Sequence, residues 1–205
     1  MPFHLRSSPV TAVLLIAIAV LFLVETWAGG STNQQVLYAF GANEPISVLQ
    51  QGQWWRLFTS MFLHIGFAHV LLNGWALYQL GSLYEMAVGS SRMLMVYLAS
   101  GLAGSVASVL WRPEGLSAGA SGAIFGLLGA MIAFLLRRRD RLTPYAKSLL
   151  GQLVVWAGIN VFFGFSIGSG AIDNAAHLGG CAAGFLMGLL LRGREPETRP
   201  VEAPV

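Results

Sequence analysis

The chain has 205 residues, and its composition excludes an ordinary water-soluble domain. It is 55% hydrophobic and only 10% charged, with a mean hydropathy of +0.65, whereas a soluble domain carries about 25% charged residues. The formal net charge of +3 does not indicate a nucleic-acid partner. The single cysteine, Cys181, excludes a disulfide within the chain. The composition therefore predicts an all-α protein embedded in a lipid bilayer.

Six runs without Asp, Glu, Lys or Arg account for most of the chain. Each has 18 or more residues, near the ~20 that a helix needs to cross about 30 Å of hydrocarbon. Helices suit this environment because they satisfy their own backbone hydrogen bonds, which lipid cannot do. The first run has a basic start but no cleavage pattern followed by a soluble domain, so it is not a signal peptide. We predict one membrane-spanning helix in each run: Ser7–Val24, Leu57–Tyr84, Met93–Trp111, Gly115–Leu136, Ser148–Ile172 and Asn174–Leu191.

The distribution of basic residues predicts the orientation of these six spans. If the N-terminus is cytoplasmic, only Arg56 and Arg112 lie outside among the 12 Lys and Arg residues. This asymmetry fits the positive-inside rule, and the reversed orientation does not. Both termini are therefore expected in the cytoplasm. Residues 1–191 would form one six-span domain, and the charged, Pro-rich tail 192–205 is expected to be a disordered cytoplasmic segment.

One connection is much longer than the others. Residues 25–56 join the first two spans, and the predicted topology places them outside the cell. The segment mixes Trp, Tyr and Phe with polar residues, a composition typical of chain that lies at the membrane interface. We expect this external loop to be ordered on the membrane surface.

Polar side chains from three different spans lie at one depth. Each of these runs ends at a charged residue on the cytoplasmic side. Measured from that residue, the polar side chain lies 15 or 16 residues away, roughly 22–24 Å of helix. The polar residues are Ser121, His69 and His177. Asn73 lies one turn from His69 on the same helix face. Polar groups within a membrane normally face the bundle interior or a wet cavity. Coincident depth on three helices therefore predicts one site, a little below the outer surface.

These residue types together match the requirements of acyl transfer. The Ser121 hydroxyl is a weak nucleophile until a base takes its proton, and a neutral histidine such as His177 is suited to that task. Acyl transfer also needs donors for the developing oxyanion. His69, Asn73 and the backbone N–H of Ser121 at a helix N-terminus can supply them. The site therefore predicts a serine hydrolase that works inside the bilayer.

Glycines supply the close approach that such a site requires. Helices usually lie 8–10 Å apart, yet the serine hydroxyl and the imidazole must come within about 3 Å of each other. Small residues spaced by four let membrane helices pack backbone to backbone. Such residues line both helices concerned: Gly119, Gly122 and Gly126 on one, and Gly180, Gly184 and Gly188 on the other.

Other hydrolytic chemistries fit the sequence poorly. There is no H-E-x-x-H motif, and the histidines and the one cysteine have no zinc-site spacing, so no metal or other cofactor is expected. The soluble hydrolase motif G-x-S-x-G is absent because residue 123 is alanine. Asp173 lies four residues before His177 and could orient it. A loop charge or helix N-cap is the simpler interpretation of Asp173, so we do not infer a catalytic triad.

Two motifs resemble those that carry the catalytic residues of the rhomboid family of intramembrane serine proteases. "GASGAIFG" resembles the family's GxSG motif and places the nucleophile at Ser121. "AHLGGCAAG" resembles the AHxxGxxxG motif of the last core helix and places the base at His177. The glycines of the two motifs are Gly119, Gly122, Gly180 and Gly184.

Two further motifs extend the resemblance over roughly residues 10–191. "HIGFAHVLLN" resembles the family's HxxxxHxxxN pattern, with the oxyanion-side residues at His69 and Asn73 and a further histidine at His64. "WWRLFTSMFLH" resembles the Trp-Arg motif of the first external loop, at Trp55 and Arg56.

The resemblance implies a fold and an activity. It implies a six-helix rhomboid-like bundle in which a Ser–His dyad without an acid cleaves transmembrane protein substrates near their outer ends. The lack of extra domains is similar to the simpler prokaryotic members, which implies location in a prokaryotic inner membrane. One residue departs from the pattern. Family members often have Tyr four residues after the serine, and this chain has Phe125, which can stack on the histidine but offers no hydroxyl.

Two other classes of function stay open at this point. The same fold serves non-catalytic rhomboid-like proteins that bind membrane segments, but these usually lack the Ser or the His. A small transporter or channel would use the polar layer to bind a solute, and inverted repeats with broken helices would be expected. The chain shows no such repeat. The sequence predicts neither the physiological substrate nor the oligomeric state.

Overall fold

The structure is a computed structural model that describes residues 5–111, 114–166 and 172–191, and the predicted tail 192–205 lies outside these ranges. Within them the chain is helical and forms no strand, apart from one isolated antiparallel bridge between Asn43 and Ser117. The helices are η1 (Leu5–Ser7), α1 (Pro9–Trp27), α2 (Gln34–Phe40), α3 (Pro45–Leu49), α4 (Arg56–Thr59), η2 (Ser60–Phe62), α5 (Phe67–Ala76), η3 (Leu77–Gly81), α6 (Ser82–Val88), α7 (Ser90–Trp111), α8 (Ser121–Leu136), η4 (Arg139–Arg141), α9 (Pro144–Ser166) and α10 (Asn174–Leu190).

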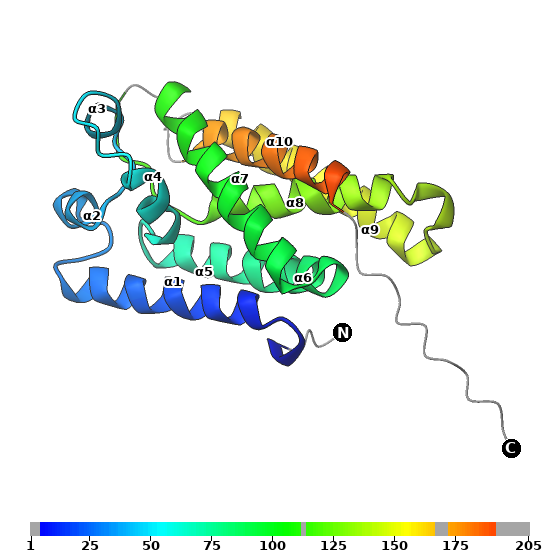
Figure 1. Ribbon diagram of the computed structural model, residues 1–205. Helices are drawn as coiled ribbons and strands as arrows, with labels where there is room; N and C mark the ends of the chain where they lie inside the picture. The colour runs from blue at the N-terminus through cyan, green and yellow to red at the C-terminus, as the bar shows by residue number, and fades with distance from the viewer. Residues whose placement is uncertain (1–4, 112–113, 167–171, 192–205) are drawn as a thin grey trace, which may run out of the picture.

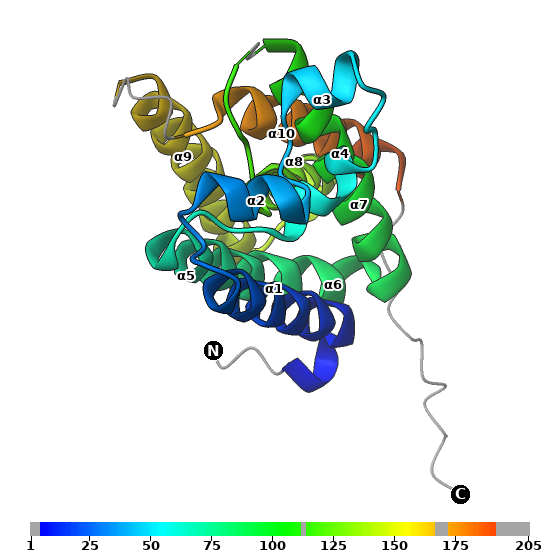
Figure 2. The same ribbon diagram turned by 90° about the vertical axis from the view of Figure 1, so that its left-hand side faces the viewer.

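Helix α8 lies at the centre of the bundle. Twelve of its sixteen residues are buried, and α7 and α10 pack along it. Figures 1 and 2 show α1 running beside the continuous stretch α5–η3–α6 on one side of this group. Helix α9 packs on α8 and α10 at one edge and buries none of its residues completely. The main hydrophobic core therefore forms around α8.

Glycine controls the contact between α8 and α10. A Cβ atom added to Gly180 would collide with the carbonyl oxygen of Gly122, and one added to Gly184 would collide with that of Gly126. No side chain therefore separates the two helices, and their backbones touch. The prediction that the glycine faces bring the serine helix against the histidine helix is confirmed.

Two of the predicted spans differ from their apolar runs, since one is broken and the other begins late. The run from Leu57 was expected to form one helix, and this was wrong: Arg56–Phe62 and Phe67–Val88 are separate helical stretches bent by 90°. Gly66 between them has φ +84°, a left-handed conformation that glycine adopts without steric cost. The run from Gly115 likewise becomes helical only at Ser121. Hydropathy detects apolar chain but not these breaks.

The number of spans is only partly supported by helix length. Among the described residues, three helices, α1, α7 and α9, are long and apolar enough to cross a membrane, and the bent pair makes a fourth if it is counted as one span. Helices α8 and α10 have 16 and 17 residues, roughly 24–26 Å, which is shorter than a bilayer's hydrocarbon core. The six-span count and the cytoplasmic location of both termini stay predictions.

Arg56 organises residues 25–56, the segment called the external loop after its predicted location. The segment is ordered, and its position at the membrane surface stays a prediction. The Arg56 guanidinium is buried, donates to the carbonyl oxygens of Tyr38 (2.8 Å) and Ala42 (3.1 Å), and donates from Nε to the Gln53 amide oxygen (2.6 Å). It also lies over the rings of Tyr38 and Trp55. These contacts fold the loop residues before α4 around one cation.

Glu85 on α6 caps α1 from outside that helix. Its carboxylate accepts hydrogen bonds from the backbone N–H groups of Val10 (2.9 Å) and Thr11 (2.8 Å) and from the hydroxyls of Thr11 and Ser90 (both 2.7 Å). The first N–H groups of a helix have no partner within it, and the side chain of the N-cap residue Ser8 makes no such bond. Glu85 therefore joins the ends of α1, α6 and α7.

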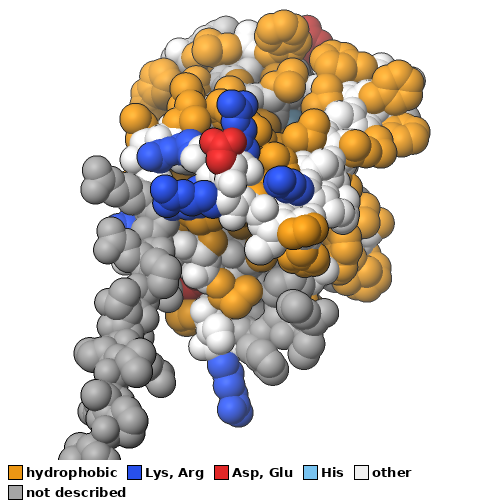
Figure 3. Space-filling model, turned by 90° about the vertical axis from the view of Figure 1, so that its right-hand side faces the viewer, with side chains coloured by type: hydrophobic (Ala, Val, Ile, Leu, Met, Phe, Trp, Pro, Cys, Tyr) orange, Lys and Arg blue, Asp and Glu red, His pale blue; other side chains and the backbone are white. Residues whose placement is uncertain are grey.

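Basic residues gather at the α8–α9 turn. Figure 3 shows Lys and Arg side chains around one acidic group on an otherwise largely apolar face. Arg137 donates to the carbonyl oxygens of Leu189 (2.5 Å) and Leu191 (3.1 Å) at the end of α10. Arg139 pairs with the exposed Asp140 at 3.7 Å. This cluster lies at the opposite ends of α8 and α10 from Ser121 and His177.

We expect Gly184→Ala to lower the free energy of unfolding by about 1–3 kcal/mol, because the new methyl group must push α8 away from α10. Thermal unfolding in detergent micelles, followed by circular dichroism, measures the change. Gly158→Ala on α9 is the matched control, since a Cβ there meets no atom within 4 Å. Equal unfolding temperatures for the two variants would contradict the close helix contact.

We expect Glu85→Ala to destabilise the protein by about 2–4 kcal/mol, because two backbone N–H groups at the start of α1 lose their acceptor in a buried place. The same unfolding measurement tests this. Asp140→Ala is the control, because that carboxylate is 92% exposed and its removal should cost less than about 0.5 kcal/mol. A Glu85→Ala protein as stable as this control would show that the cap contributes nothing.

Candidate active site

A cavity of about 680 Å³ opens among α5, α8, α9 and α10, and the predicted site residues meet in it. His69 and Asn73 reach it from α5, Ser121 from the first position of α8, and His177 from the first turn of α10. Ser121, which was predicted from sequence to be the nucleophile, therefore shares one cavity with the predicted base. The remaining predicted residues that line it are Gly119, Gly122 and Phe125.

The His177 ring is held by stacking. It is only 7% exposed and lies parallel to the Phe125 ring, with 4.1 Å between the centroids and 8° between the planes. Phe125 in turn contacts Trp156 of α9, with centroids 5.7 Å apart. Phe125 thus stacks on the histidine as expected, without a hydroxyl. Nδ1 of His177 is buried and has no hydrogen-bond partner within the described ranges.

The segment before Ser121 is fixed by backbone contacts. The N–H of Gly119 donates to the carbonyl oxygen of Ser60 at 2.9 Å, and the N–H of Ala120 points to Nε2 of His64 at 3.5 Å. His64 is fully buried behind the cavity rather than in its wall. These contacts define where α8 starts, and so where the serine hydroxyl lies.

Gly119 also sets the distance between this segment and His69. Its φ is +146°, and an added Cβ would lie 2.7 Å from Cε1 of the His69 ring. The His69 ring makes an edge contact with His64, with centroids 5.2 Å apart. Asn73 donates from Nδ2 to the backbone carbonyl of His69 at 3.0 Å, which orients its amide. His69 and Asn73 thus face the cavity from one helix, as predicted.

Some predicted residues lie elsewhere. Trp55 and Arg56 are not part of the cavity lining and act in the external loop. Gly180 and Gly184 mediate helix packing. Asp173 is the N-cap of α10, because its side chain accepts from the N–H of Ala176, so the N-cap interpretation is confirmed.

Several parts of the cavity wall were not assigned from the sequence, among them Trp156 and Asn160 of α9. Asp173, which was considered from the sequence but not assigned to the site, also lines the cavity at the start of α10. Asn160 is a polar residue in an apolar run, and that signal could have been used. Trp156 carried no signal that would separate it from the other aromatic residues of the chain.

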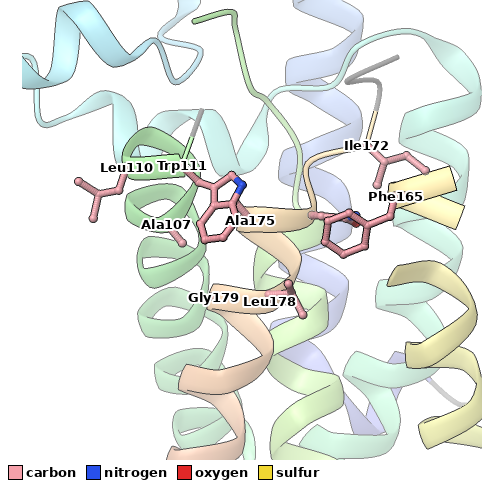
Figure 4. A pocket seen from close by; sticks show the side chains of 10 residues that line it. Ala107, Leu110, Trp111, Phe165, Ile172, Ala175, Leu178 and Gly179 are labelled. Atoms are coloured by element: carbon pink, nitrogen blue, oxygen red, sulfur yellow. The ribbon is translucent and has the colours of Figure 1, made fainter. Parts of the chain in front are cut away.

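A second cavity, of about 550 Å³, lies between α7, α9 and α10. Figure 4 shows Trp111, Phe165, Leu178 and other apolar side chains around it. Its described lining contains no serine, histidine or acidic side chain. Across the described ranges, moreover, no three His, Cys, Asp or Glu residues are grouped to hold a metal ion. The first cavity is therefore the candidate active site.

Comparisons with known proteins agree with this arrangement. A family model described as "Rhomboid domain" matches residues 51–194. The chain is 44% identical over 182 residues to rhomboid protease GluP of Bacillus subtilis (strain 168), covering 88% of this chain and 34% of GluP. It is 40% identical over 156 residues to RHOMBOID-like protein 1 of Arabidopsis thaliana, covering 75% of this chain and 39% of that protein.

A third relative is similar to the chain over nearly its whole length. The putative rhomboid protease YdcA of Bacillus subtilis is 31% identical over 187 residues, which cover 91% of this chain and 90% of YdcA. The chain thus spans well under half of GluP and of RHOMBOID-like protein 1. These matches show that the chain belongs to the rhomboid family. Together with its apolar helices they identify an integral membrane protein.

We expect Phe125→Ala to destabilise the protein by about 3 kcal/mol, because a buried ring that is 3% exposed is replaced by a void. Thermal unfolding in micelles measures this. Phe162→Ala on α9 is the control, because that ring is 66% exposed and loses little packing. Equal unfolding temperatures for the two variants would show that the Phe125 ring contributes no more packing energy than an exposed ring.

Proposed function

We propose that the chain is an intramembrane serine endopeptidase that cleaves transmembrane segments of protein substrates. In this proposal Ser121 is the nucleophile and His177 is the base that takes its proton. The observation that carries the proposal is the shared cavity: both residues stand at the starts of adjacent helices and line one space. The names of GluP and YdcA as rhomboid proteases support the same activity.

The mechanism uses two groups rather than three. His177 would remove the Ser121 proton as the hydroxyl oxygen attacks a peptide carbonyl, and would then return it to the leaving amine. An acid on Nδ1 is not part of the proposal, which agrees with the absence of a partner for that atom within the described ranges. The Phe125 ring would hold the imidazole in place of an acid.

The oxyanion would be stabilised by three donors around the cavity. His69, the Asn73 amide and the N–H of Ser121 are the candidates, and preorganised donors of this kind are worth about 10²–10³ in rate each. The His69 ring makes an edge contact with His64 and lies close to Gly119, and these contacts help to position it. Water entering the cavity would then hydrolyse the acyl-enzyme.

The substrate side of the proposal follows from the topology prediction. With both termini cytoplasmic, the site lies near the outer face of a membrane, for which we propose the prokaryotic inner membrane. A substrate helix must unwind locally there, because an intact helix keeps its carbonyls in i→i−4 hydrogen bonds. Residues 1–191 would make up the catalytic domain.

We expect Ser121→Ala and His177→Ala each to abolish cleavage of a fluorogenic transmembrane peptide by protein reconstituted in liposomes. The Ala side chain cannot attack a carbonyl, and without the imidazole the serine keeps its proton. Labelling with a serine-directed fluorophosphonate, followed by mass spectrometry of the labelled peptide, identifies the reactive residue independently.

Ser166→Ala, at the end of α9 and outside the cavity lining, is the matched control and should cleave and label as the wild type does. Full cleavage by the Ser121→Ala protein would refute the nucleophile assignment. Absence of both cleavage and labelling in the wild type, with the peptide still bound, would favour the alternative of a non-catalytic binder of membrane segments.

A further inference from the structure

The carboxylate of Asp173 connects three separate parts of the site. One oxygen, Oδ1, accepts the N–H of Ala176 in the first turn of α10 at 3.0 Å. The other, Oδ2, accepts the hydroxyl of Ser108 on α7 at 2.5 Å and the hydroxyl of Ser117 at 2.6 Å. A helix cap requires only the first of these contacts. The second oxygen therefore serves the two serines.

Ser117 is itself firmly placed, so its contact with Asp173 transmits position. Its backbone N–H and carbonyl oxygen both pair with Asn43 of the external loop, at 2.9 and 2.8 Å. The Asn43 side chain donates to the carbonyl oxygen of Ser105 on α7 at 2.9 Å. Ser117 and Asp173 are thus both fastened to α7, and hydrogen bonds to a carboxylate are among the stronger ones.

The spacing along the chain brings this connection close to the reacting groups. Ser117 lies four residues before Ser121, and Asp173 lies four residues before His177. The glycine contacts of Gly180 and Gly184 fix the two helices only farther along α10. Nearer the starts of the two helices, the described contacts include the hydrogen bond from the Ser117 hydroxyl to the Asp173 carboxylate, which joins the serine segment to the histidine helix.

We propose that Asp173 is a positioning residue, which holds the Ser121 segment and the start of the His177 helix in register through Ser117 and Ser108. The inference rests on the proposed function, because it concerns the alignment of that nucleophile and base. Asp173 acts through the Ser117 hydroxyl on one segment and the Ala176 N–H on the other, and not as a third member of a charge relay. A carboxylate is suited to the position because its two oxygens accept three hydrogen bonds at once.

The test compares Asp173→Ala, Asp173→Asn and Ser117→Ala in steady-state cleavage of the transmembrane peptide. We expect Asp173→Ala to lower kcat at least tenfold with KM within twofold, because misalignment by a fraction of an ångström affects the reacting atoms more than substrate binding. Asp173→Asn should recover most of kcat, since its oxygen can cap α10 and its NH₂ can donate to the serine hydroxyls. Ser117→Ala should lower kcat, and combining it with Asp173→Ala should add little.

Thermal unfolding of each variant separates positioning from simple stability. Three outcomes would overturn the proposal: wild-type kcat in Asp173→Ala, a kcat loss that only follows the loss of folded protein, or an Asp173→Asn protein as slow as Asp173→Ala. If Asp173→Ala does not fold, wild-type kcat in Ser117→Ala and Asp173→Asn together would overturn it.

Glu44→Gln is the matched control. Glu44 caps α3 with both oxygens, accepting from Ile46 and Ser47, but it does not line the cavity. Although partial burial acts to raise it, these hydrogen bonds hold the pKa of Glu44 below its ordinary value. The variant should keep wild-type kcat. Failure of the proposed function itself would appear in the wild-type protein, as absence of cleavage and of Ser121 labelling, whereas failure of this inference would appear only in the variants.

Discussion

Helices α8 and α10 meet backbone to backbone, and the candidate site depends on that contact. Ordinary side chains would keep the two axes 8–10 Å apart. Here Gly180 and Gly184 lie directly against the carbonyl groups of Gly122 and Gly126. Because both helices begin at the same level, this contact brings their first turns together, and Ser121 and His177 lie in those turns. The two candidate catalytic groups are therefore positioned by the absence of side chains between the helices.

The elements around this pair complete the site from several directions. Helix α5 supplies His69 and Asn73, and Gly119 lies against the His69 ring where a larger residue would not fit. The Phe125 ring stacks on the imidazole of His177. Glu85 and Arg56 lie outside the cavity lining. Glu85 fastens α1 to α6, and Arg56 holds the external loop together. Glu85 and Arg56 each have hydrogen-bond partners on other segments of the chain.

The sequence was informative where a structural feature depends on one residue type at a regular spacing. Apolar runs located the helices, and glycines four residues apart predicted the contact between α8 and α10. It was less informative where the backbone changes direction, because Gly66 breaks an apolar run that hydropathy reads as continuous. The bonds of Asp173 to Ser108 and Ser117 join residues 65 and 56 positions apart. Only the folded arrangement brings such residues together, so no local pattern could predict them.

The two central helices start differently, and this difference has an electrical consequence. Asp173 caps the start of α10, whereas no side chain from the described part of the chain caps α8 at Ala120. The aligned peptide dipoles of a helix leave about half a positive charge at its first turn. At α10 the carboxylate neutralises that charge, and at α8 it stays directed toward the cavity. Negative charge is therefore stabilised at the serine's side of the cavity more than at the histidine's, although no lysine or arginine is among the described lining residues.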